Sequence, residues 1–281
     1  MRCRLVGSEM CIRDSPYSTK EPSKKYKLPK ELNEISGLTF IDDNTLASVQ
    51  DEKGEIFLFD LKEEEILADL KFAKGNDYEG IAFHKNKISV VTSSGILHTM
   101  TLKNNELKNI KQSNISQNST ANLEGICYHP SSKSYLLAYK GKTAYDNLHE
   151  RSIYQYPFAN KINKPFITIG NQQIKNYINQ VDNPSKRMEK LKKNLVFAKA
   201  SILPSGIAIH PTTKNIYIIS SVNELLVVLD AKTHQIINIS FFDNEKIPQP
   251  EGIAFNNKGD MFIATEKNKN KSAYIYKFKA Q

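Results

Sequence analysis

Pro250-Glu251-Gly252-Ile253 is one of five copies of a short phrase that recurs along this chain of 281 residues. The other four copies are Ile35-Ser36-Gly37-Leu38, Tyr78-Glu79-Gly80-Ile81, Leu123-Glu124-Gly125-Ile126 and Pro204-Ser205-Gly206-Ile207. Successive glycines lie 43, 45, 81 and 46 residues apart, and a recurrence of roughly 40 to 50 residues is typical of the blades of a β-propeller. The phrase therefore predicts repeated units of one size, with one step that is too long.

Each copy of the phrase opens a run of alternating apolar residues, which is followed by a turn and further runs of the same kind. In the fourth unit these runs cover residues 206–210, 215–220 and 225–230. Their β-branched and aromatic side chains suit twisted, half-buried strands, so each unit is expected to be an antiparallel meander. A glycine at the head of every innermost strand fits the crowded axis of a ring. We predict an all-β fold, a five-bladed β-propeller.

The two ends of the chain predict how the ring closes. The last unit contains strands at residues 252–255, 261–265 and 273–278 and then stops, so it lacks a fourth strand. Residues 25–29, Lys-Tyr-Lys-Leu-Pro, precede the first glycine phrase just as residues 239–242 precede the last one. We predict that residues 25–29 form the outer strand of the last blade, because this pairing removes open sheet edges.

The long step between the third and fourth glycines indicates an insertion. After a strand-like run at residues 166–169, apolar residues recur at helical spacing: Ile174, Tyr177, Ile178 and Val181. A break at residues 182–184 is followed by a second apolar face made of Met188, Leu191 and Leu195. We predict a small helical insertion at about residues 171–195. A sixth, degenerate blade in the same segment is the rival architecture.

Residues 1–15 depart from the pattern of the other units. They contain no lysine, although the remainder of the chain is rich in lysine. The stretch resembles translated sequencing-adaptor sequence, and we expect it to be an artefact that is not part of the fold. We therefore predict one propeller domain at residues 16–281. The natural N-terminus is expected to be missing, and with it the position at which a signal peptide or lipid anchor would lie.

The formal net charge of +9 raises the question of a nucleic-acid partner. The lysines are scattered through the predicted turns, and the cluster at residues 267–271 has no interleaved aromatic residues on which bases would stack. We therefore predict no nucleic-acid partner. Cys127 is the one cysteine outside residues 1–15, so no disulfide framework is expected, and we interpret Cys127 as a small buried hydrophobe.

Carboxylates recur at one end of the predicted ring. The residue before the glycine is an acid in three phrases, at Glu79, Glu124 and Glu251. The second strand of each meander runs back antiparallel, so its end, with Asp51 or Glu266, lies at the same rim, and Glu34 is near it. Carboxylates held together without counter-charge take up protons or a cation, and all-oxygen sets favour a hard ion. We predict a Ca²⁺ site made of Glu34, Asp51, Glu79, Glu124, Glu251 and Glu266.

Two alternatives to calcium stay open at this rim. In the first, the glutamates bond backbone amides of the neighbouring blade and only lock the ring. In the second, the ammonium group of Lys140 supplies the counter-charge. A zinc site at the opposite mouth is the weaker interpretation of three histidines that lie four residues after repeat glycines, because they begin tight turns in which a polar side chain bonds the backbone: His84, His129 and His210.

A family resemblance is carried by the glycine phrases together with their flanks. The segments include Tyr139-Lys140-Gly141-Lys142, and the most specific ones lie in the fourth and fifth units: Pro204-Ser205-Gly206-Ile207-Ala208-Ile209-His210-Pro211 and Pro248-Gln249-Pro250-Glu251-Gly252-Ile253-Ala254-Phe255. Over roughly residues 24–281 the chain resembles the SdiA-regulated protein family. The resemblance implies a five-bladed propeller distantly related to NHL repeats, a calcium site, and a bacterial cell-envelope location behind an N-terminal anchor. No enzymatic activity is established for that family, so the resemblance does not imply one.

Two functional classes follow from these expectations. The leading one is a calcium-binding, non-catalytic β-propeller of the cell envelope that binds a protein or a small ligand at the channel mouth, with membrane anchorage through the missing N-terminus. The alternative is a metal-dependent hydrolase, similar to lactonases and phytases. A hydrolase needs an open metal position and a general base, and Asp51 and the three glutamates that precede repeat glycines are candidates for both.

Overall fold

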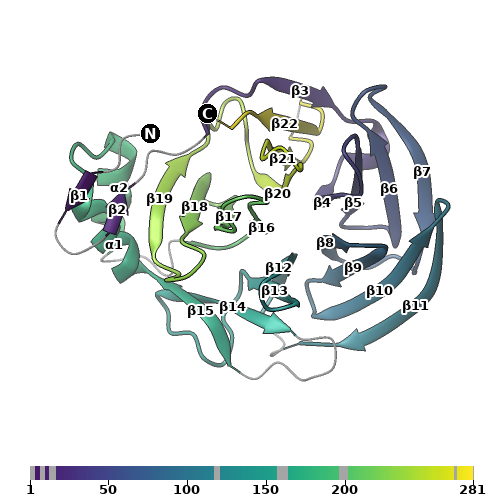
Figure 1. Cartoon of the computed structure of the whole chain (residues 1–281), viewed down its shortest axis with the longest axis horizontal. Coiled ribbons are helices and arrows are strands. Elements are labelled where there is room, and N and C mark those ends of the chain that lie inside the picture. Colours follow the sequence, from purple (N-terminus) through teal and green to yellow (C-terminus); the bar gives the residue numbers. More distant parts are fainter. Residues whose placement is uncertain are drawn as a thin grey trace.

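The computed structural model describes residues 4–6, 10–12, 17–116, 121–156, 164–195, 202–268 and 271–280. Five four-stranded antiparallel sheets are arranged in a ring (Figure 1). This arrangement confirms the predicted five-bladed β-propeller. We number the sheets as blades I to V in the order of their innermost strands.

Each blade is a meander that runs outward from the axis of the ring. Blade I consists of β4 (Ile35–Phe40), β5 (Thr45–Gln50), β6 (Glu55–Asp60) and β7 (Glu65–Lys71). Blade II consists of β8 (Tyr78–His84), β9 (Lys87–Thr92), β10 (Ile96–Lys103) and β11 (Glu106–Asn114). Blade III consists of β12 (Leu123–His129), β13 (Ser134–Tyr139), β14 (Glu150–Tyr156) and β15 (Pro165–Gly170). Blade IV consists of β16 (Gly206–Ile209), β17 (Ile216–Ser220), β18 (Leu225–Leu229) and β19 (Ile236–Phe241).

Blade V joins the two ends of the chain, as predicted. Its inner strands are β20 (Pro250–Phe255), β21 (Met261–Thr265) and β22 (Tyr274–Phe278), and its outer strand is β3 (Lys24–Lys27). Strand β3 pairs antiparallel with β22 and places Tyr26 opposite Ile275. A short 3₁₀ helix, η1 (Lys30–Leu32), then leads into blade I. The N-terminal strand therefore closes the ring.

The hydrophobic core lies between the blades. Each pair of neighbouring blades shares one cluster of buried apolar side chains, and the fifth cluster joins blade V to blade I. The alternation of apolar residues along the strands is what supplies both faces of each sheet with such side chains. The packing therefore holds the inner strands in a fixed radial arrangement, which positions the residues at the channel mouth.

The repeat glycines lie where neighbouring inner strands approach each other most closely. A Cβ atom built on Gly37 would lie 3.0 Å from the carbonyl oxygen of Glu79 and 3.1 Å from the Cα of Gly80, both in the next blade. The glycine of blade IV meets the backbone of blade V in the same way, because a Cβ on Gly206 would lie 3.0 Å from the carbonyl oxygen of Glu251. The glycine recurs in each blade because the backbones of neighbouring inner strands are in close contact there.

This contact predicts the effect of one added methyl group. In the Gly37→Ala variant the new Cβ must displace backbone atoms of blade II, so we expect a loss of about 1–3 kcal/mol in the free energy of unfolding. Denaturant unfolding measures this loss. The control is Thr39→Ala, a change at a partly exposed position of the same strand, which should cost less. Equal stability of Gly37→Ala and the wild type would contradict the close approach.

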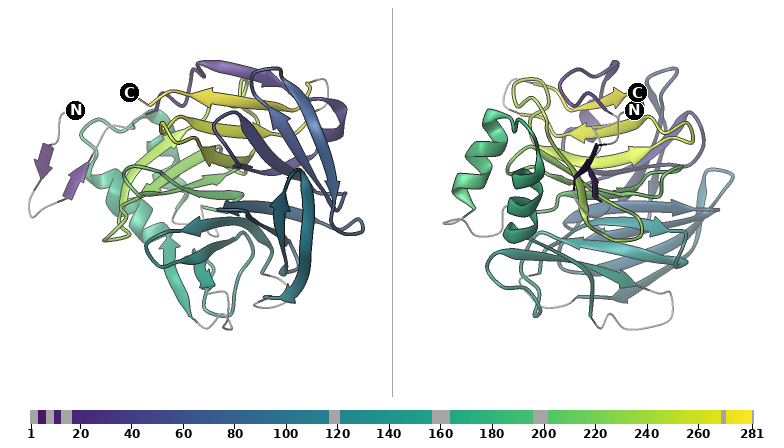
Figure 2. Two further views of the ribbon diagram at one scale, coloured as in Figure 1. Left: turned by 45° about the vertical axis from the view of Figure 1, so that its right-hand side comes forward. Right: turned by 60° about the vertical axis from the view of Figure 1, so that its left-hand side comes forward.

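The insertion between blades III and IV contains two helices, α1 (Asn171–Gln180) and α2 (Lys186–Asn194). They lie outside the ring, where buried residues of both helices join the apolar cluster shared by blades III and IV (Figures 1 and 2). Ser185 caps α2 by accepting a hydrogen bond from the backbone nitrogen of Met188, 3.2 Å away. The helical insertion is confirmed, and the rival of a sixth blade is wrong, because the described residues form five blade sheets.

Residues 4–6 (β1, Arg4–Val6) and 10–12 (β2, Met10–Ile12) form a separate two-stranded sheet beside β19, outside the ring (Figure 1). They add no strand to any blade, in agreement with their departure from the repeat pattern. The other residues of segment 1–15 lie outside the described residues. Within the described part of the chain, no helix has both the length and the apolar character needed to cross a membrane.

Candidate metal centre at the channel mouth

A β-bulge sets the direction of the side chain that precedes the repeat glycine in most blades. In blades I, II, III and V the pairing of the first two strands skips this residue, which makes it the extra residue of a β-bulge. A bulge re-aims a side chain, and bulges are frequent next to functional sites. The residues aimed in this way are Ser36, Glu79, Glu124 and Glu251. Together with Ser205 they line a narrow cavity of about 10 Å³, which is close to the space of one water molecule.

The two serines of this set lock neighbouring blades together. Ser36 Oγ donates a hydrogen bond of 2.6 Å to the carbonyl oxygen of Tyr78, from blade I to blade II. Ser205 Oγ donates a hydrogen bond of 2.6 Å to the carbonyl oxygen of Pro250, from blade IV to blade V. The two serines therefore link neighbouring blades through backbone carbonyl groups, and a locking role of the glutamates stays a prediction.

The three glutamates of the set, which we call the axial glutamates (Glu79, Glu124 and Glu251), have polar partners at the mouth. Glu124 accepts a hydrogen bond of 2.5 Å from the side-chain amide of Asn122 and forms an ion pair with the Lys140 ammonium, 3.2 Å away. Glu251 accepts a hydrogen bond from the side chain of Ser221. Lys140 therefore occupies the predicted rim as the direct counter-charge of one axial glutamate.

Burial dominates the protonation of the axial glutamates. It raises the pKa of Glu79 to about 9, with a further contribution from repulsion by Glu124, and it raises the pKa of Glu251 to about 8. The pKa of Glu124 is also raised by burial, although the ion pair with Lys140 opposes the shift. Without a further cation, two of these carboxyls hold their protons at neutral pH.

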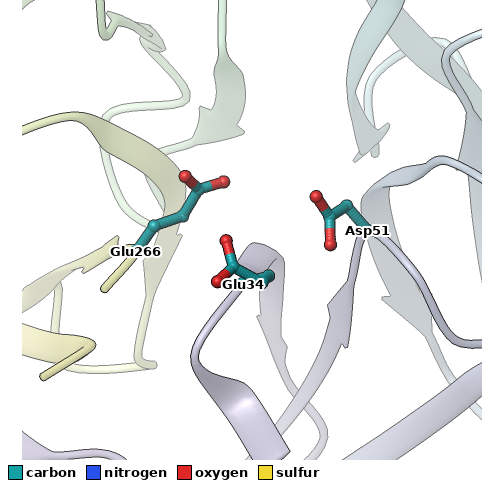
Figure 3. Close-up of side chains that lie close together, drawn as sticks. All are labelled: Glu34, Asp51 and Glu266. Atoms are coloured by element: carbon teal, nitrogen blue, oxygen red, sulfur yellow. The ribbon is translucent and has the colours of Figure 1, made fainter. Parts of the chain in front are cut away.

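A second group of acids lies farther round the same mouth. Glu34, Asp51 and Glu266, which we call the acidic trio, each offer one oxygen atom within 4.8 Å of those of the other two (Figure 3). Glu34 precedes β4 and Asp51 follows β5, both in blade I, whereas Glu266 follows β21 in blade V. Figure 3 shows the three carboxylates facing a common space. The trio therefore spans the junction at which the ring closes.

Backbone hydrogen bonds hold the trio in place. The nitrogen of Asp51 donates to the carbonyl oxygen of Glu34 over 3.2 Å, and the carbonyl oxygen of Asp51 accepts from the nitrogen of Tyr78 over 3.1 Å. On the other side, the nitrogen of Lys267 donates to the carbonyl oxygen of Asn33 over 2.7 Å. These bonds tie the end of β21 to the start of blade I, so that Glu266 meets the two acids of that blade.

The electrostatics of the trio favour a bound cation. Burial, followed by repulsion from Glu34 and Asp51, raises the pKa of Glu266 to about 7. Burial and repulsion from Glu34 also raise the pKa of Asp51. Among the side chains that the structure describes, Asp51 Oδ1 is the buried polar atom without a hydrogen-bond partner. No ion pair within the described residues involves the trio.

Ca²⁺ fits this donor set. The ion takes six to eight oxygen ligands and accepts carboxylates in flexible geometries, and the trio supplies carboxylate oxygens alone. A buried acceptor without a partner is costly, and a cation at the common space would satisfy Asp51 Oδ1. The predicted metal residues thus fall into two groups, the acidic trio and the axial glutamates, and their role as calcium ligands stays a prediction.

Two features of the mouth were not predicted from the sequence. One is the role of Asn122, whose side chain supports Glu124 and whose backbone has a φ of 46°, a left-handed conformation that asparagine tolerates better than most residues. The signal was present, because Asn122 lies two residues before Glu124. The other is the division of the acids into two groups, for which the sequence carries no signal.

The opposite mouth is a hollow of about 410 Å³ with largely apolar and aromatic side chains around it. His210 Nδ1 accepts hydrogen bonds from the backbone nitrogens of Thr212 and Thr213, and His129 Nδ1 shares a hydrogen bond of 2.5 Å with Ser132 Oγ. His210 therefore bonds the backbone of its turn, as predicted, whereas His129 bonds the side chain of Ser132 within its turn and not the backbone. His84 instead stacks on Tyr128 with ring centroids 3.6 Å apart.

The fold and the site define a class of protein: a five-bladed β-propeller whose ring closes through an N-terminal strand. Acidic side chains gather at one mouth of its channel. The chain belongs to the SdiA-regulated family, whose model matches residues 20–272. The expected family is thereby confirmed. Among curated proteins, no match to the sequence was found.

Solved structures share the fold at low sequence identity. The PQQ-bound aldose sugar dehydrogenase of Streptomyces coelicolor superposes with a TM-score of 0.59 at 11% identity, covering 92% of this chain and 97% of that one. The glutaminyl cyclase of Myxococcus xanthus gives 0.59 at 12% identity, covering 92% and 95%. A luciferin-regenerating enzyme gives 0.53 at 11% identity, with the same coverage. A Bacteroides caccae protein of unknown function gives 0.46 at 13% identity, and the alignment spans 79% of this chain and 65% of that one. At 11–12% identity, the three matches with TM-scores of 0.53 to 0.59 show a common fold alone.

Proposed function

We propose that this protein is a calcium-binding, non-catalytic β-propeller of the bacterial cell envelope that binds a protein or a small ligand at its acidic channel mouth. The observation that carries the calcium assignment is the acidic trio with its buried, unpartnered Asp51 Oδ1. The envelope location is proposed because the resemblance to the SdiA-regulated family implies it.

Calcium bound at the trio would act on the closure of the ring. Glu34 and Asp51 belong to blade I and Glu266 belongs to blade V, so an ion held by all three would link the first blade to the last. The ion would neutralise the repulsion that, after burial, contributes to the raised pKa values of Asp51 and Glu266. It would therefore stabilise the mouth in one conformation, which suits a surface that binds a partner.

Calcium titration by isothermal calorimetry tests the proposal. We expect the wild type to bind one Ca²⁺, and we expect Glu266→Gln, which keeps the size of the side chain and removes its charge, to weaken binding at least about tenfold, roughly 1.4 kcal/mol. The matched control is Glu65→Gln, which removes an exposed acid on the outer strand β7 and should leave calcium binding unchanged. No heat at millimolar calcium, or equal affinity in Glu266→Gln, would exclude the trio as the site.

The non-catalytic part of the proposal has its own test. Purified protein with saturating calcium is incubated with a lactone, a phosphomonoester and phytate, and hydrolysis is followed for the wild type and for Glu266→Gln. We expect no turnover above background in either protein. Turnover by the wild type that disappears in Glu266→Gln would replace this part of the proposal with the alternative of a metal-dependent hydrolase.

A further inference from the structure

The axial glutamates differ from the acidic trio because a lysine ammonium group lies beside them. Within the described residues, the group of acids whose oxygens converge within 4.8 Å is the trio, and the axial glutamates do not form such a group. The Lys140 ammonium is present among them instead, 3.2 Å from Glu124 Oε2. A protein-derived cation therefore occupies the part of the mouth that is nearest the axis.

The main chain holds Lys140 at this place from two sides. Its backbone nitrogen donates a hydrogen bond of 2.9 Å to the carbonyl oxygen of Asn122, beside the inner strand β12. Its carbonyl oxygen accepts a hydrogen bond of 2.7 Å from Nε of Arg151 in β14. Arg151 is a buried residue, with 8% of its surface exposed. The base of the Lys140 side chain is thus fixed next to Glu124, and Asn122 orients the same carboxylate.

The charge of the Lys140 ammonium group affects the pKa values of acids throughout the channel mouth. It lowers the pKa values of all three axial glutamates against the larger effect of burial, and it does the same for Glu266 in the trio. In return, the carboxylates raise the pKa of Lys140 although burial opposes its charge. The Lys140 ammonium is therefore the direct counter-ion of Glu124, and it also favours the charged forms of Glu79, Glu251 and Glu266.

We propose that Lys140 is the resident cation of the axial glutamates and excludes Ca²⁺ from them, so that calcium binds at the acidic trio alone. The part that concerns the trio rests on the proposed function, whereas the part that concerns the axial glutamates does not. The lysine ammonium sits on a flexible four-carbon stem and carries three hydrogen-bond donors, so it can serve neighbouring carboxylates as donor and counter-charge. Its removal leaves Glu124 without its counter-ion in a buried, all-oxygen set, and a Ca²⁺ ion that displaces the protons of Glu79 and Glu251 would supply the missing positive charge.

The Lys140→Met variant tests the proposal, because methionine keeps an unbranched apolar stem and removes the ammonium group. Calcium binding is measured by equilibrium dialysis at pH 8 in the full chain. We expect one Ca²⁺ per wild-type molecule and two per Lys140→Met molecule. The double variant Lys140→Met with Glu124→Gln should bind one again, and the control Lys142→Met, on the same loop, should bind one like the wild type.

Several outcomes separate this inference from the calcium assignment at the trio. If the wild type binds none and Lys140→Met binds one, the inference holds and the assignment at the trio fails. If a folded Lys140→Met binds the same number as the wild type, the inference is overturned. If Lys140→Met does not fold, the single variant Glu124→Gln decides, because it should retain the calcium ion of the trio, and its loss of calcium would show that the ion is held by the axial glutamates.

Discussion

Deletion of residues 24–29 is expected to convert the protein from a folded propeller into an aggregating species. The deletion removes β3, which pairs with β22 and closes blade V. It also removes Tyr26 and Leu28 from the apolar cluster between blades I and V. Complete burial of such side chains is worth about 1.5–3 kcal/mol each, so the loss is a large fraction of the stability of a typical domain. Size-exclusion chromatography and thermal unfolding measure the effect.

The exposed edge of β22 is the reason to expect aggregation and not only lower stability. A sheet edge with unpaired backbone groups is a template for pairing with another chain. The control is deletion of residues 1–15, whose described parts, residues 4–6 and 10–12, contribute no strand to a blade. This deletion should leave the melting temperature unchanged. A monomeric, equally stable protein after deletion of residues 24–29 would contradict closure through β3. A large loss of stability on deletion of residues 1–15 would contradict their interpretation as an artefact.

The calcium-free protein is expected to lose stability as the pH rises from about 6 to 9. In the folded state the pKa values of Glu266, Glu251 and Glu79 are raised to about 7, 8 and 9, whereas a glutamate in the unfolded chain titrates near 4.3. In this window the folded protein holds protons that the unfolded chain has already lost. The stabilisation is therefore fully present only below the unfolded-state pKa near 4.3, and it is lost as the pH rises from there through the folded-state pKa values of about 7, 8 and 9.

The expected size of this effect is up to about 1.4 kcal/mol per pH unit for each proton involved, which corresponds to a decrease of several degrees in melting temperature across the window. Thermal unfolding in a chelator at several pH values measures it. Glu251→Gln should flatten the dependence below about pH 8, where folded Glu251 holds its proton and the unfolded chain does not, and the exposed control Glu65→Gln should not. Calcium should raise the melting temperature most at high pH, because protons no longer compete for Glu266. A melting temperature that rises with pH in the chelator would contradict the raised pKa values.

The sequence by itself determined the architecture of this protein. Local patterns predicted it: the glycine phrases, the period-two alternation of apolar residues, and the helical spacing of Ile174, Tyr177 and Ile178. Each pattern indicates a local structure that is stabilised by hydrophobic burial. The glycines report a backbone contact between inner strands, as a Cβ on Gly37 would meet the backbone of Gly80 at 3.1 Å. Ring closure was also predictable, because a missing fourth strand at one end matched an extra strand at the other.

Only the tertiary structure decided how the acids of the mouth are divided. Glu34, Asp51 and Glu266 are far apart in the sequence and meet because closure through β3 and the hydrogen bond from Lys267 to Asn33 bring blades I and V together. Lys140 pairs with Glu124 because β13 ends beside the start of β12. Spacing predicts which end of a strand a residue occupies. Coulombic and coordination effects depend on separations of a few ångströms, and these are set by blade packing and by the bulges that aim each side chain.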